Sequence, residues 1–173
     1  SRDYHRKVWG QLLLSFADEE NVDEFLKQAE KQGLHQPVFE KLIQLGRLDA
    51  ALEVAQKHLT TTGWERLQAA QTLYAAGRKD DALAFAKAGL PDKDLRLAEW
   101  VAEEYARRGD TAGALELQLT RWQTGPSMNL YETLEQLAKK LQQWESLRPR
   151  LLAELEKGSH ATLLADIYLR DKE

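Results

Sequence analysis

The sequence predicts an all-α fold, namely a right-handed α–α superhelix of about four to five antiparallel helical hairpins. The first observation is a turn motif, and its glycines are 31 and 32 residues apart, a period typical of stacked hairpins. The second is that apolar residues recur at helical spacing between the turns. The third is composition, since the 173 residues are 43% hydrophobic and hold only 10 glycines and 4 prolines. The three copies of the motif are Gly46-Arg47-Leu48-Asp49-Ala50-Ala51-Leu52, Gly77-Arg78-Lys79-Asp80-Asp81-Ala82-Leu83 and Gly109-Asp110-Thr111-Ala112-Gly113-Ala114-Leu115.

Composition also narrows the class of protein. No apolar run reaches the roughly 18 residues that a membrane span needs, and residues 1–7 lack the apolar core of a signal peptide. The absence of cysteine excludes disulfides and cysteine-ligated zinc within the chain and favours a cytoplasmic protein. The formal net charge of −4 argues against direct contact with nucleic acid. Without an initiator methionine, the chain is expected to be a fragment of a longer protein.

The first hairpin is predicted over residues 2–33. Asn21 is expected to cap its second helix, because an asparagine side-chain oxygen can accept from the free amides of a first turn. Gly33 is expected to end that helix. The apolar stripe of its first helix is Val8, Trp9, Leu12, Leu13 and Phe16.

Two regular hairpins follow, over residues 36–60 and 64–90. Glycine suits the turn inside each, because it adopts positive φ without a Cβ clash. Asp49 and Asp80 suit the start of the returning helices, where amide groups are free. Residues 60–63 (Thr-Thr-Thr-Gly) separate the two hairpins, and Pro91 ends the second.

The remaining chain is predicted to form hairpins over 94–124 and 128–157 and a final helix over 160–171. In the hairpin 128–157, Leu141 stands where the turn glycine is expected. Pro149 lies inside the returning helix, which is therefore expected to be kinked or to begin late. The last helix has no partner left and suits a fragment or a C-terminal cap. We expect residues 1–173 to form a single helical-repeat domain.

The Gly-Arg-x-Asp-x-Ala-Leu turn, the small residues after it and the aromatic residue before it resemble a tetratricopeptide-like (TPR-like) solenoid. More narrowly, residues 36–170 resemble the C-terminal helical region of bacterial SWIM zinc-finger proteins. This resemblance implies a role in protein interaction, and it carries over no functional residue, because the family's cysteine-containing zinc motif cannot lie in this chain. The segments that carry it, besides residues 46–52, are Leu97-Ala98-Glu99-Trp100-Val101-Ala102-Glu103-Glu104-Tyr105, Pro126-Ser127-Met128-Asn129-Leu130-Tyr131 and Leu163-Leu164-Ala165-Asp166-Ile167-Tyr168-Leu169.

No catalytic constellation is present in the sequence. It has no glycine-rich phosphate loop, nucleophile elbow, His-Glu-x-x-His or calcium loop. Adjacent acidic residues do not converge, because neighbours on a helix point about 100° apart. The scattered histidines are His5, His35, His58 and His160. We therefore expect no enzymatic activity, no cofactor and no metal.

The candidates for binding lie on the first helix of each hairpin, which lines the inner surface of such a superhelix. Trp64 follows Gly63 at a helix start, where it can be exposed and anchor a partner. The other tryptophans (Trp9, Trp100, Trp122 and Trp144) fall on apolar stripes and are expected in packing. The full set of partner-binding candidates is Trp64, Gln68, Gln71, Glu99, Glu103 and Arg107. The alternative is that this surface is only solvated, as is the basic cluster of residues 2–7 if no acidic partner covers it.

Two functional hypotheses follow. The first is a non-catalytic protein–protein interaction or scaffold module that binds a protein or peptide, or another part of its parent chain. The second is an accessory helical domain of a DNA-associated SWIM zinc-finger protein. The two differ in what the parent protein must contain, since the second requires an upstream Cys-x-Cys and Cys-x-His pattern.

Overall fold

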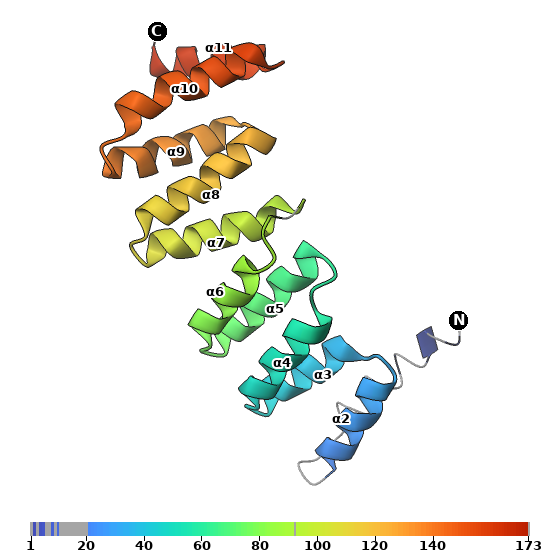
Figure 1. The fold of residues 1–173 in the computed structure, drawn as a ribbon. Helices are drawn as coiled ribbons and strands as arrows, with labels where there is room; N and C mark the ends of the chain where they lie inside the picture. Colours follow the sequence, from blue (N-terminus) through green and yellow to red (C-terminus); the bar gives the residue numbers. More distant parts are fainter. Residues whose placement is uncertain are drawn as a thin grey trace. The chain divides into compact units, whose positions relative to one another are not determined.

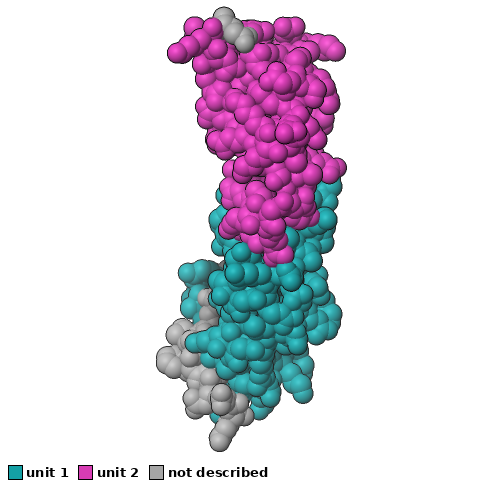
Figure 2. Space-filling model, turned by 90° about the vertical axis from the view of Figure 1, so that its left-hand side faces the viewer, with its two compact units in different colours: residues 1–97 teal, residues 98–173 magenta. Residues whose placement is uncertain are grey.

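The computed structural model describes residues 2, 4, 5, 8, 10, 21–91 and 93–172. Regular secondary structure in this part of the chain is entirely α-helical (Figure 1), which confirms the all-α prediction. The chain divides into two compact units, residues 1–97 and 98–173 (Figure 2). The helices are α2 (Val22–Lys31), α3 (His35–Gln44), α4 (Leu48–His58), α5 (Gly63–Ala75), α6 (Lys79–Lys87), α7 (Leu95–Arg107), α8 (Thr111–Thr124), α9 (Met128–Lys140), α10 (Trp144–Lys157) and α11 (Ala161–Asp171).

In the first unit, α3 packs extensively on α4 and α5 on α6, as two helical hairpins (Figure 1). Small residues at matching positions after each turn are fully buried, namely Ala51 and Ala82. A small side chain at this position lets the two helices of a hairpin approach closely. The stripe predicted for the first helix of the chain (Trp9, Leu12, Leu13 and Phe16) lies outside the described residues.

The same turn geometry ends α2, α3, α5, α7 and α9. At Gly77, φ is +96°, and the following amide, of Arg78, donates to the carbonyl of Leu73. This is the Schellman cap, in which a residue in the left-handed region closes the last helical turn. The other residues with this geometry are Gly33, Gly46, Gly109 and Gln142.

The turn of the hairpin 128–157 differs from the prediction. The residue in the left-handed region is Gln142, with a φ of +57°, and not Leu141. Counting a fixed offset from Gly109 misplaced it, because the segment leading to this turn is one residue longer. The returning helix does not begin late either, since α10 begins at Trp144 and continues through Pro149.

The expected cap of α2 is also absent. Asn21 precedes α2, but its side chain makes no capping hydrogen bond. Its φ and ψ of −106° and −5° are helical, whereas a capping side chain needs an extended backbone to reach the first-turn amides. Side-chain caps are found instead at Thr62, Asp110 and Ser127, which precede α5, α8 and α9.

Ion pairs link consecutive segments of the first unit through the turn motif. Arg47 pairs with Asp23 of α2, so that the first motif arginine reaches back to the preceding helix. Arg78 Nη1 lies 2.6 Å from Asp49 Oδ1, and its Nε lies 2.6 Å from Asp81 Oδ2. Asp49 therefore serves as the partner of the next motif arginine, and its side chain makes no cap at the start of α4.

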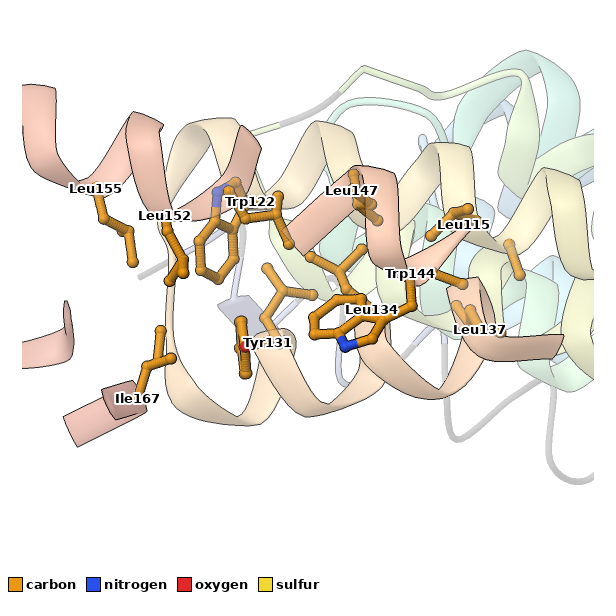
Figure 3. Close-up of a cluster of buried hydrophobic side chains, with 14 residues drawn as sticks. Leu115, Trp122, Tyr131, Leu134, Leu137, Trp144, Leu147, Leu152, Leu155 and Ile167 are labelled. Atoms are coloured by element: carbon orange, nitrogen blue, oxygen red, sulfur yellow. The ribbon is translucent and has the colours of Figure 1, made fainter. Parts of the chain in front are cut away.

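The second unit has a continuous apolar core between α8, α9, α10 and α11 (Figure 3). Tyr131 lies at its centre, with ring centroids 6.3 Å from Trp122 and 5.3 Å from Trp144. Both tryptophans are buried, as expected from their place on apolar stripes. The buried members are Ala114, Leu115, Trp122, Leu130, Tyr131, Leu134, Leu137, Ala138, Trp144, Leu147, Leu151, Leu152, Leu155 and Ile167.

Candidate functional site

The start of α5 is held by two reciprocal hydrogen bonds. Thr62 Oγ1 accepts from the amide of Glu65 at 3.1 Å, and Glu65 Oε2 accepts from the amide of Thr61 at 3.1 Å. This closely follows the capping box, which satisfies amides that a helix start leaves free. The box fixes the backbone on both sides of Gly63 and Trp64, so the position of the Trp64 side chain is set by a rigid support.

An open pocket of about 560 Å³ lies beside this helix start, in the first unit. It is lined by α3, by the segment before α5 and by the first turns of α5. We call it the Trp64 groove, and its lining residues are Gln36, Thr61, Thr62, Trp64, Glu65 and Gln68. Two of the predicted candidates, Trp64 and Gln68, therefore line the same hollow.

Trp64 is one of the few large apolar side chains left exposed, with 49% of its surface accessible. The guanidinium carbon of Arg96 lies over the indole, 4.5 Å from the ring centroid. Asp94 holds that guanidinium with bonds of 2.8 and 2.9 Å, and these hydrogen bonds lower the pKa of Asp94. A fixed cation on the ring limits the positions that Trp64 can take.

The polar groups of the groove are mainly amides and hydroxyls. Gln36 Nε2 donates to Glu40 Oε1 at 2.9 Å, which orients its carboxamide. Gln68 makes no side-chain hydrogen bond within the part of the chain that the structure describes, and its carbonyl accepts from the Thr72 hydroxyl at 3.0 Å. A carboxamide offers one acceptor and two donors, so it can pair with both groups of a peptide unit.

The other predicted candidates have different surroundings. Gln71 is exposed on α5 and does not line the groove. Glu99, Glu103 and Arg107 belong to the second unit. There, Glu99 lies 3.8 Å from Arg121, Arg107 lies 3.2 Å from the buried Glu104, and Glu103 is exposed.

The sequence reasoning missed a pair of stacked histidines in the first unit. His35 and His58 have ring centroids 3.6 Å apart and planes 3° from parallel. A signal was present, because His35 lies 11 residues before Gly46 and His58 lies 11 residues after Arg47. Residues equidistant from the turn of a helical hairpin lie opposite each other. The groove residue Gln36 had no comparable signal, since only packing of α3 beside α5 brings it there.

Neither a metal centre nor a membrane span is found in the described part of the chain. No group of three or more histidine, aspartate or glutamate side chains there could hold a metal ion. None of the helices in that part is long and apolar enough to cross a membrane. Comparison of the chain with protein-family models, with curated proteins and with solved structures finds no match.

Proposed function

We propose that this chain is a non-catalytic binding module that holds an extended segment of a protein in the Trp64 groove. The observation that carries the proposal is the half-exposed indole at the wall of an open hollow otherwise lined by polar side chains. A rigid, partly exposed tryptophan is a typical anchor for a protein partner, because it buries a large area at little entropic cost. The two carboxamides supply hydrogen bonds to the backbone of the bound segment.

The character of the groove favours a peptide over a small apolar ligand. Sites for small apolar ligands are enclosed and lined mainly by apolar side chains, whereas Trp64 is the only aromatic residue among the lining residues. The acidic side chains at and beside the groove are Glu65 and Glu40. Their charge favours a segment that carries lysine or arginine.

The right-handed superhelix expected from the sequence belongs to the same proposal. It is supported by the repeated turn motif and by the ion pairs that join consecutive segments in the first unit. Small-angle X-ray scattering tests it, because a superhelix gives a profile distinct from that of two units joined without fixed order.

The proposed function is tested by selecting short random peptides displayed on phage against the purified chain. We expect peptides rich in lysine and arginine to be enriched on the wild type and to lose binding on Trp64→Ala. Gln68→Ala should weaken binding, and Gln71→Ala, an exposed change on the same helix outside the groove, should leave it unchanged. Circular dichroism verifies that each variant is folded.

Three outcomes would contradict the peptide-binding proposal. One is that no peptide is enriched, and another is that Trp64→Ala binds the selected peptides as tightly as the wild type. The third is that the chain binds duplex DNA with higher affinity than any peptide at physiological salt. That result would instead favour the accessory domain of a DNA-associated protein.

A further inference from the structure

The stacked histidines join the two ends of one hairpin. His35 is the first residue of α3, and His58 is the last residue of α4. Their rings lie face to face, with centroids 3.6 Å apart. The contact therefore closes the open end of the hairpin, opposite the Gly46 turn.

This geometry does not suit a shared metal ion. The lone pair of an imidazole nitrogen lies in the plane of its ring, and two ligands of one metal must direct their lone pairs to a common point. Planes 3° from parallel at this separation direct them along parallel lines. The stack is consequently a packing contact between rings.

The same geometry opposes protonation. Nδ1 of His35 is buried and has no hydrogen-bond partner, so an imidazolium would place a buried N–H there without an acceptor. A charged His58 ring would lie directly against it. Burial first and His58 second lower the pKa of His35 below its ordinary 6.5, although Glu30 of α2 and Glu65 of α5 act in the opposite direction.

We propose that the His35–His58 stack is a pH-sensitive latch, and that its protonation in mildly acidic solution separates the start of α3 from the end of α4. The latch adjoins the Trp64 groove on both sides. Gln36 directly follows His35, and Thr61 and Thr62 follow His58 by three and four residues. Separation of the helices is independent of the proposed function, whereas its effect on binding rests on that function.

The direction of the effect follows from proton linkage. The folded-state pKa of His35 is lower than its unfolded value of 6.5, so the unfolded or opened state binds the proton more tightly. The stabilisation is complete above 6.5 and is lost as the pH falls through the folded-state pKa. The opening constant of the hairpin should rise about tenfold for each unit by which the pKa is lowered.

Hydrogen exchange of backbone amides tests the latch, measured at about pH 8 and pH 5 and corrected for intrinsic exchange. In the wild type, opening of residues 35–58 should increase at the lower pH. His35→Phe keeps a flat ring on His58 but cannot be protonated, so its opening should not depend on pH in this range. His160→Gln, in the second unit, is the matched control and should behave as the wild type.

A titration of the wild type by NMR makes the test independent of whether the phenylalanine variant folds. An inflection for the His35 ring protons at or above 6.5 would overturn the latch, as would equal pH dependence of opening in the wild type and His35→Phe. The coupling to the groove is read from a peptide selected at neutral pH. Its affinity should fall at about pH 5 for the wild type only. Unchanged affinity despite increased opening would overturn the coupling, while failure to select any peptide would count against the proposed function alone.

Discussion

Tyr131 joins three helices of the second unit through one hydroxyl group. It donates to Asp171 Oδ2 of α11 at 2.9 Å and accepts from Arg148 Nε of α10 at 3.1 Å. Burial, together with the bond to Asp171, raises the pKa of Tyr131 to about 12. The hydroxyl therefore stays protonated, and keeps donating, well beyond the pH at which an exposed tyrosine ionises.

Removing this hydroxyl should destabilise the second unit measurably. We expect Tyr131→Phe to lower the free energy of unfolding by about 1.5–3 kcal/mol, because a hydrogen bond to a charged group is lost. Urea denaturation checks this value. Tyr168→Phe is the control, since the Tyr168 hydroxyl has no partner among the described residues, and it should change stability little. A raised pKa also means that the wild type loses stability from about pH 10 to pH 12, a loss that the variant should lack.

Single residues differ in how far the sequence could predict their roles. Trp64 was a candidate because Gly63 marks a helix start, and exposure at a helix start depends mainly on local structure. Gln36 and the His35–His58 stack depend on which helices lie side by side, so periodicity on one helix cannot identify them. Asp49 was misjudged for the same reason, since its partner lies one repeat away.

At the level of elements, the turn at Gln142 is strained where the other helix ends are not. Gln142 adopts a φ of +57°, whereas the equivalent residues after α2, α3, α5 and α7 are glycines. A side chain in the left-handed region costs about 1–2 kcal/mol, part of which glycine recovers at some entropic cost.

Gln142→Gly should therefore stabilise the protein, by about 0.5–1 kcal/mol in the free energy of unfolding. Gln143→Gly is the matched control. Its φ of −111° suits any residue, so glycine there should only add entropy to the unfolded chain and destabilise slightly. Thermal denaturation of the two variants decides the matter, and equal shifts would mean that the left-handed backbone carries no strain.

The ion pairs of the turn motif should stabilise the contact between hairpins. We expect Arg78→Ala to lower the melting temperature more at low salt than at high salt, because the pairs lie near the surface. Arg78→Lys should restore only part of the loss, since an ammonium cannot contact both Asp49 and Asp81 as a guanidinium does. A double-mutant cycle with Asp49→Ala measures the coupling, and additive effects would contradict it.

Helices were predictable here because a strong local signal marks their ends. Glycine before the returning helix and apolar residues at helical spacing placed α3 to α6 with small errors in their bounds. Pro149 was misleading, because one missing amide did not outweigh the buried stripe of Trp144, Leu147, Leu151 and Leu155 that holds α10 together. Packing of the apolar face stabilises a helix more than propensity does.

At the scale of the whole molecule, the two units should respond to acid in different pH ranges. In the first unit, the sensitive group is the stacked His35. In the second, burial raises the pKa values of Asp171 and Glu135, but the hydrogen bonds they accept lower them further, so that both lie below their ordinary values of 3.8 and 4.5.

Acid should consequently loosen residues 35–58 first. Stability from Asp171 and Glu135 is present above their ordinary pKa values and is lost only as the pH falls through the lowered ones. Hydrogen exchange followed from about pH 7 to pH 3 should show opening of α3 and α4 at mildly acidic pH, with α9 and α11 protected until below about pH 4. Simultaneous opening of both units would contradict separate titration.

The Gly-Arg-x-Asp turn also bears on how such a chain can grow. Each copy carries both halves of the ion pair, the arginine that reaches back and the aspartate that awaits the next copy, as Arg78 and Asp49 show. A tandem duplication of the gene segment would thus bring its own complementary contact, with no compensating mutation elsewhere. Where Asp110 replaces the arginine and instead caps α8, that inherited rule of addition has been exchanged for a different local role.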